Sequence, residues 1–245
     1  MRTSNKILIA AFALLITSLA FFDLSLKAEY QKGDYTDPYR NFVKLDYKNF
    51  NAVELRSSTA INIMLAQGPF KVMATPQVID ALDISQEKNR LIIGAKFRDH
   101  FRGMNTDYTL YISCPTLASL KADASYLADN IKFTDTIARD LNWRPTMITG
   151  FKADSLDILE DHAANVILQN NTIKHLNATI GQGDRSGSAL TIGVNNQFTS
   201  TDINVLNRSR LWIKGTNVNN INYQLADSAS LIVNGAEAKH LLNLK

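Results

Sequence analysis

The densest group of acidic side chains lies in the segment DSLDILEDH, and carboxylates are the groups that could give this chain chemistry. Two of them about 5 to 9.5 Å apart could hydrolyse a glycosidic bond, and several together could hold a divalent cation. The strand pattern predicts that Asp157 points outward between apolar neighbours, while Glu160 and Asp161 fall on a bend. No second acidic cluster recurs at a matching offset. We therefore expect a solvated face, with no catalytic residue and no metal site, from Asp154, Asp157, Glu160, Asp161 and His162.

A glycine-rich segment, Gly181-Gln182-Gly183-Asp184, could be mistaken for a phosphate-binding loop. Such a loop leads from a strand into a helix whose N-terminus faces the phosphate. Here residues 188–192 (SALTI) follow, and they are typical of a strand. The segment therefore predicts a flexible turn.

The histidines give no sign of a metal or cofactor site. They share no metal-ligand spacing and have no cysteine partner. We expect surface or turn positions, and no cofactor, for His100, His162, His175 and His240.

Three aromatic residues are the candidate ligand contacts: Trp212, Trp143 and Tyr223. Exposed aromatic rings can stack on sugars or anchor a protein partner. Trp212 stands between Leu211 and Ile213, so it faces outward if those two face inward. It is the strongest single candidate for a contact residue.

Repeats in the last 75 or so residues indicate which elements would position these side chains. Leu190, Leu211 and Leu231 open similar strands 21 and 20 residues apart, and apolar residues alternate around them with the two-residue period of a strand. Repeats of 20 to 50 residues are typical of stacked architectures. No helical stripe is long enough for a crossover, so the predicted fold is all-β, a parallel β-helix (β-solenoid).

Asparagine pairs recur between the predicted strands. They are 25 and then 24 residues apart, and Asn tolerates the left-handed backbone of tight turns. Their amides could stack as a ladder, as in cross-β assemblies, or the pairs could be solvent-facing loops. Both interpretations stay open for the pairs Asn170/Asn171, Asn195/Asn196 and Asn219/Asn220.

The N-terminal residues differ from the rest of the chain. Arg2 and Lys6 precede an apolar stretch, residues 7–22, that continues past Asp23 to Leu26. This is just long enough for a transmembrane helix, which needs about 20 residues. The small-residue cleavage site at residues 18–20 lies inside the apolar run, which favours a retained signal anchor over a cleaved signal segment.

The domains follow from this segment. We expect a membrane anchor or signal segment in residues 1–27, a polar linker in 28–41 and a head domain in 42–245. The basic N-terminal flank places the amino terminus in the cytoplasm and the head outside it, in the periplasm or at the cell surface. The membrane, reached through the N-terminal segment, is thus one predicted partner.

Composition limits the kinds of protein and partner that this chain could represent. Hydrophobic residues make up 45% and charged residues 20% of the chain, as in ordinary globular domains. Beyond residue 28 there are 23 basic and 22 acidic residues, which gives no reason to expect a nucleic-acid partner. Cys114 is the single cysteine, so an intramolecular disulfide is excluded, and its strand-like setting predicts a small buried hydrophobic residue.

The N-terminal half of the head carries further strand signals. They fall at residues 52–55, 61–66, 70–74, 91–95 and 109–113, with a short helical turn at 77–82. Residues 135–145 are an irregular insertion that carries Trp143, expected as a loop over the side of the coil.

Three segments resemble a known family. FNAVELRSSTAINIMLAQGPFKVMAT, NRLIIGAKF and DYTLYISCPTLASLKADASYLA are similar to the head domains of auto-transporter adhesins, called GIN domains, whose function is unknown. The resemblance covers roughly Phe50 to the C-terminus and includes the turn from Ser113 to Leu117. It implies an exported protein of Bacteroidetes type with a right-handed β-helix, and it brings no catalytic residues. The chain departs from the family in having residues 122–124 (ADA) where members commonly place a glycine.

Two functional classes remain. The first is a noncatalytic envelope protein, an adhesin or binding module that presents a strand surface to glycans or envelope proteins. The alternative is a carbohydrate-active enzyme, a polysaccharide hydrolase or lyase with a groove along the coil.

Overall fold

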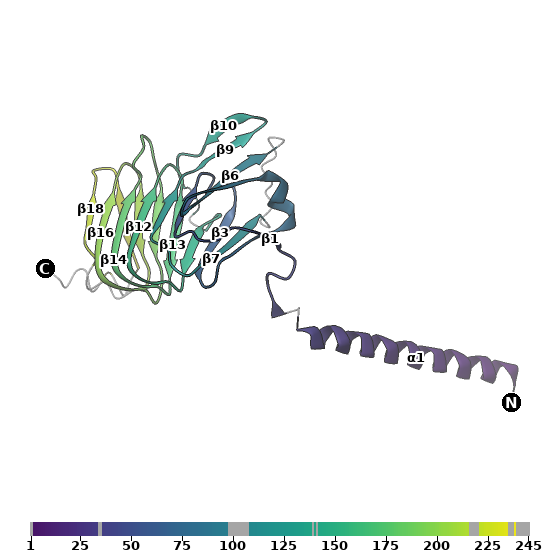
Figure 1. Ribbon diagram of the computed structural model, residues 1–245. Helices are drawn as coiled ribbons and strands as arrows, with labels where there is room; N and C mark the ends of the chain where they lie inside the picture. Colours follow the sequence, from purple (N-terminus) through teal and green to yellow (C-terminus); the bar gives the residue numbers. More distant parts are fainter. Residues whose placement is uncertain are drawn as a thin grey trace. The chain divides into compact units, whose positions relative to one another are not determined.

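The computed structural model describes residues 2–33, 36–97, 108–138, 140, 142–215, 221–234 and 238 (Figure 1). The chain divides into two compact units, Met1–Phe42 and Val43–Lys245. The first unit contains a long helix, and the second contains the strands.

The first unit is built on helix α1, Thr3–Lys32, none of whose residues is buried. Among the described residues, α1 is the one helix long and apolar enough to cross a membrane. Its 30 residues extend about 45 Å, more than the roughly 30 Å of a hydrocarbon core. By length and composition it fits a signal segment or a membrane anchor.

The helix extends farther than the sequence predicts. It includes residues 28–32, which were expected at the start of the linker, because AEYQK is rich in good helix formers. Gly33 ends it in the left-handed conformation, with φ 71°.

In the second unit, nine strands of the described residues form one sheet. Their order across this nine-stranded sheet is β1 (Val43–Leu45), β4 (Lys71–Ala74), β7 (Thr109–Cys114), β3 (Asn62–Gln67), β11 (Thr146–Thr149), β13 (Asn165–Gln169), β15 (Ala189–Ile192), β17 (Arg210–Ile213) and β19 (Ser230–Val233).

A second sheet has ten strands within the described part of the chain. The order is β10 (Ile131–Thr134), β9 (Ser125–Ala128), β6 (Arg90–Phe97), β2 (Ala52–Leu55), β8 (Ser119–Ala122), β12 (Lys152–Glu160), β14 (Thr172–Ile180), β16 (Gln197–Val205) and β18 (Tyr223–Leu225), with β5 (Leu82–Glu87) paired to β6. A short 3-10 helix, η2 (Pro76–Ala81), precedes β5 and lies where the sequence predicts a helical turn.

The predicted right-handed parallel β-helix is wrong for this chain. Both sheets are mixed: β1, β4 and β7 pair antiparallel, and so do β5 with β6 and β9 with β10. A repeating parallel coil would make every neighbouring pair parallel. The repeated leucines and asparagines used for the prediction lie after residue 169, so they carry no information about residues 43–134, where the antiparallel pairs lie.

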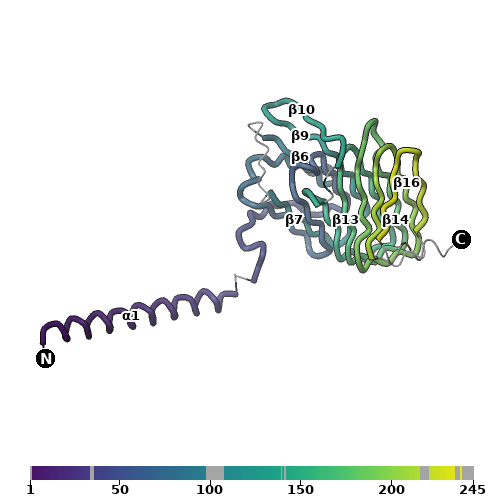
Figure 2. Tube along the Cα trace, turned by 180° about the vertical axis from the view of Figure 1, so that it is seen from behind, coloured from purple at the N-terminus to yellow at the C-terminus, as the bar shows by residue number. Residues whose placement is uncertain are grey.

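From β11 onward the nine-stranded sheet is parallel, and its leucines are aligned. Leu190 pairs with Leu211, and Leu211 pairs with Leu231. Strands β12 to β19 alternate between the two sheets along the chain, and Figure 2 shows β14 and β16 side by side from behind. One core cluster contains inward residues of both sheets, because the two-residue period turns every second side chain toward it.

The asparagine pairs form a ladder where the structure describes them. Asn171 and Asn196 are buried and joined by a side-chain hydrogen bond, and the exposed Asn195 donates from Nδ2 to Oδ1 of Asn170 over 3.0 Å. This favours the ladder interpretation over solvent-facing loops for the first two pairs. The third pair, Asn219/Asn220, lies outside the described residues.

The insertion at residues 135–145 is attached to the start of the repeated region. The backbone N–H of Ala138 donates to the carbonyl of Gly187 over 2.9 Å, and the N–H of Gly187 donates to Thr136 over 2.7 Å. A Cβ at Gly187 would meet Ile137 Cα at 3.2 Å, so glycine permits this close approach.

Candidate functional site

The outer face of the ten-stranded sheet carries a groove. On β12 the apolar residues Leu156 and Ile158 are 1% and 3% exposed, so Asp157 and Leu159 between and after them point outward. Strand β16 has the same burial pattern as β12 over all nine residues. Strand β14 differs from them at one position, where Ile173 is buried. The sequence therefore presents corresponding side chains on neighbouring strands.

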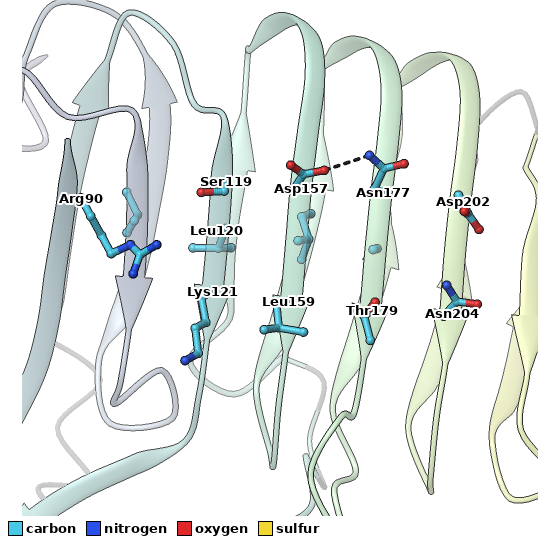
Figure 3. A pocket seen from close by; sticks show the side chains of 13 residues that line it. Arg90, Ser119, Leu120, Lys121, Asp157, Leu159, Asn177, Thr179, Asp202 and Asn204 are labelled. Atoms are coloured by element: carbon cyan, nitrogen blue, oxygen red, sulfur yellow. Dashed lines mark hydrogen bonds between the residues drawn. The ribbon is translucent and has the colours of Figure 1, made fainter. Parts of the chain in front are cut away.

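Register aligns these outward residues in two rows across the strands (Figure 3). Parallel neighbours are about 4.8 Å apart, so members of a row recur at that interval. The first row is Ser119, Asp157, Asn177 and Asp202, and the second row is Lys121, Leu159, Thr179 and Asn204.

The two rows and Arg90 line a groove of about 410 Å³, called here the outer-face groove. Its size falls in the range of small-ligand sites, about 300 to 1,000 Å³. Inside it, Asn177 Nδ2 donates to Asp157 Oδ1 over 2.8 Å. Each of these two side chains is exposed and keeps further hydrogen-bonding positions for a ligand.

Charge in the groove is balanced. Arg90 and Lys121 supply two positive groups, and Asp157 and Asp202 supply two negative ones. Arg90 is oriented by Glu54 on the neighbouring strand, with 3.6 Å between Nη1 and Oε2. A ligand that is neutral overall and rich in hydroxyls would suit this surface better than a polyanion.

A further outward row lies beside the groove. His175 Nδ1 and Ser200 Oγ are 2.7 Å apart on the paired strands β14 and β16. Lys174 Nζ lies 2.6 Å from Asp154 Oδ1, and this contact lowers the pKa of Asp154 and raises the pKa of Lys174. Both groups are exposed, so this ion pair contributes little to stability.

The structure disperses the acidic cluster. Asp154 and Asp157 are on the outer face, but Glu160 is 0% exposed and burial raises its carboxyl pKa well above 4.5. Its expected position on a bend is wrong, because it ends strand β12 on the inward side.

Asp161 and His162 occupy the turn that follows. His162 Nδ1 lies 2.7 Å from Asp123 Oδ1 and 3.8 Å from Asp161 Oδ2. Within the described residues no three His, Cys, Asp or Glu side chains form a group that could hold a metal ion. His100 and His240 lie outside the described residues.

The turn at residues 181–184 is tightly packed. A Cβ on Gly181 would come within 2.8 Å of the Leu206 carbonyl oxygen, and Gly183 donates its N–H to Asp161 Oδ1 over 2.8 Å. The predicted turn is present, and these contacts hold it in place.

The three candidate aromatic residues lie apart. Trp212 points outward from β17 on the nine-stranded sheet, and Trp143, 44% exposed, belongs to the insertion. Tyr223 on β18 is half-buried: it packs against the core, in register with the buried Ile203. Their role as ligand contacts stays a prediction.

Sequence reasoning missed most of the groove. Asp157 was noticed, but its partners Asn177 and Asp202 are single polar residues on their strands and belong to no catalytic or ligand-binding motif. A signal was present: they follow Asp157 at offsets of 20 and then 25 residues. The first two asparagine pairs also lie 25 residues apart, so carrying their register outward along the strands would have found the first row.

Comparisons with known proteins give structural neighbours at low identity. No family model and no curated protein matches the chain. A "putative adhesin" from Parabacteroides merdae aligns over 79% of this chain and 95% of its own, with 10% identity and a TM-score of 0.37. Another, from Bacteroides fragilis, aligns over 78% and 95%, with 12% identity and a TM-score of 0.40.

A third neighbour is a "putative lipid binding protein" from Parabacteroides distasonis. It aligns over 79% of this chain and 96% of its own, with 12% identity and a TM-score of 0.28. Because no family model matches, membership of the GIN domain family stays a prediction.

Proposed function

We propose that this chain is a noncatalytic binding protein of the cell envelope, an adhesin-like module whose outer-face groove holds a strand of polar glycan. Helix α1 would anchor the chain in the membrane, with the amino terminus in the cytoplasm and the second unit outside it. Glycans are favoured over envelope proteins as the partner of this groove because its two outward rows carry mostly hydrogen-bonding side chains and its charges balance.

The pair of rows is the observation that carries the proposal. Four strands in succession, β8, β12, β14 and β16, each present one residue to each row. Seven of the eight side chains can form hydrogen bonds, and they recur at about 4.8 Å. A chain of sugar units lying across the strands would meet a new set of polar groups at every step.

The arrangement of carboxyl groups favours binding over hydrolysis. A glycosidase needs a general acid whose pKa is raised, positioned beside the sugar. Burial raises the pKa of the Glu160 carboxyl, but this group lies inside the core and does not line the groove. In the groove, Asp157 accepts a hydrogen bond from Asn177 and is exposed to water.

The test is a glycan array probed with the full-length chain in a sugar-free detergent, run beside a reducing-sugar release assay on the same polymers. We expect retention on neutral polysaccharides without release. Replacing Asn177 and Asp202 together by Ala should weaken retention at least about tenfold, which is about 1.4 kcal/mol. Both side chains are exposed, so the fold should tolerate the change.

Lys174→Ala is the matched control, since it removes an exposed side chain from the same sheet beyond the groove. It should leave retention unchanged. Turnover that is lost on Asp157→Asn would establish the enzyme alternative, and retention that survives the double substitution would reject the groove as the binding site.

A further inference from the structure

A second cavity of about 540 Å³ lies between the insertion and the turn before β13. It is lined by Thr59, Asp135, Asp140, Trp143 and Asn165, among others, and it shares no residue with the outer-face groove. It thus brings together an aromatic ring, carboxylates, hydroxyls and an amide. This is the combination of one apolar surface and a few convergent polar groups that binding pockets have.

The indole of Trp143 is held in place from one side. The guanidinium carbon of Arg144 lies 5.0 Å from the ring centroid and 5.9 Å from that of Tyr108. Arg144 itself is 6% exposed and donates from Nη1 to the carbonyl of Ala60 over 2.7 Å. The indole is nevertheless 44% exposed, so a large part of the ring remains accessible beside the cavity.

Polar groups of the cavity are also fixed by contacts. Asp135 Oδ2 accepts a hydrogen bond from Thr59 Oγ1 over 2.9 Å, and the Asp135 carbonyl accepts one from the N–H of Ala163. Asp140 Oδ1 accepts the N–H of Asn142 over 2.9 Å. Asn165, 4% exposed, contributes a buried amide to the lining. These side chains therefore need little reordering when a ligand enters.

The charge of the lining restricts the ligand. Among the described residues that line it there are two carboxylates, Asp135 and Asp140, and no basic side chain. Such a pocket repels an anionic sugar and accepts hydrogen bonds from hydroxyl or ammonium groups. An exposed indole offers a flat apolar surface to the face of a sugar ring.

We infer that this cavity, called here the Trp143 pocket, is a binding site for a pyranose sugar that is neutral or bears an amine. The ring stacks on the indole, and its hydroxyl or ammonium groups donate to the carboxylates. The site does not depend on the glycan binding proposed for the outer-face groove.

Ligand-observed saturation-transfer NMR tests the inference without using tryptophan emission as the signal. The full-length chain carrying Asn177→Ala and Asp202→Ala, which disable the outer-face groove, is titrated in a sugar-free detergent with neutral, amine-bearing and uronic-acid oligosaccharides. We expect binding of the first two classes and not of the third. In that background Trp143→Ala should weaken the binding about tenfold or more, while Lys174→Ala, at an exposed side chain outside both sites, should leave it unchanged.

Asp140→Asn is a second variant that retains the backbone contact to Asn142. It should weaken the amine-bearing ligands more than the neutral ones, because it removes one negative charge. Because the outer-face groove is disabled in every sample, a loss of binding in these variants reports on the Trp143 pocket alone. Binding unaffected by Trp143→Ala, a preference for the acidic oligosaccharides, or no binding at millimolar concentrations would each overturn the inference.

Discussion

The side-chain amide of Asn171 donates to Oδ1 of Asn196 over 3.1 Å, although the two residues are 25 positions apart. Asn171 Oδ1 also accepts a hydrogen bond from the backbone N–H of Phe151, and Asn171 Nδ2 donates one to the carbonyl of Ile148. It is fully buried. One amide therefore satisfies two backbone groups of the turn between β11 and β12 and links that turn to the one that holds Asn196.

Asn171→Ala should lower the free energy of unfolding by about 2 to 4 kcal/mol, because it leaves buried backbone groups without partners. Urea unfolding measures this. Asn170→Gly is the control: it removes the exposed amide next door and suits the positive φ of 57° at that position. Equal losses for the two variants would contradict the role given to the buried ladder.

The buried carboxyl of Glu160 should make stability depend on pH. Its pKa is raised above 4.5 because burial disfavours the charged form, so the folded chain holds a proton that the unfolded chain releases. The stability that the Glu160 carboxyl contributes is fully present below its pKa in the unfolded chain. It is lost as pH rises toward its pKa in the folded chain. Glu160→Gln should remove this dependence.

The measurement is the difference in urea midpoint between wild type and Glu160→Gln at a series of pH values from 4 upward. We expect the urea midpoint of Glu160→Gln to rise relative to that of the wild type as pH increases. A difference that is the same at every pH would show that Glu160 does not titrate in this way.

Burial along the aligned leucines predicts unequal costs of truncation. Leu211 is 0% exposed, whereas Leu231 is only partly buried on the last described strand of its sheet. Leu211→Ala should cost about 2 to 5 kcal/mol and Leu231→Ala about 1 to 2 kcal/mol. Denaturant midpoints of both variants check the ranking, and the reverse order would mean that Leu231 is the better covered residue.

Trp212 should contribute more to stability than an outward position alone suggests. Lys214 Nζ lies 3.3 Å from its ring centroid, and its Nε1 donates to Asn234 Oδ1 over 3.1 Å. Trp212→Ala should therefore cost about 1 to 3 kcal/mol in thermal or urea unfolding. A cost near zero would restore the simpler expectation for a ring on the outside.

The thiol of Cys114 should be unreactive in the folded chain. It is fully buried, and burial raises its pKa to about 12. Since the thiolate is the reactive form, a thiol-specific reagent at pH 8 should label it only after unfolding. Rapid labelling of the native chain would show that the strand β7 opens readily.

Local sequence pattern predicted β2, β3, β4, β6 and β7 near their observed bounds and the inward residues of the repeated strands, but it missed β1, β5, β9, β10 and β11. Leu190, Leu211 and Leu231 pair as their spacing indicates, because identical positions in successive repeats fall into register. The same reasoning did not extend to β4, which pairs antiparallel with β1 and β7. No repeat covers β4, so the antiparallel partners that make this sheet mixed could not be derived from the sequence.

The candidate sites show the same boundary between local and distant information. Outward positions such as Asp157 and Trp212 follow from alternation alone. The Trp143 pocket could not be predicted from the sequence, because Thr59, Asp135 and Asn165 come from separate segments that only the packed insertion brings together. Polar residues in an irregular loop carry no period that would place them.

Because each strand of the outer face contributes one residue to each row, the length of the groove is counted in strands. Removing a segment such as residues 172–196, which holds one strand of each sheet, would shorten both rows by a single step and bring Asp157 beside Asp202. Duplicating it would add a step. The span of a bound polymer could thus change during evolution by whole units, while the chemistry at every remaining position is inherited unchanged.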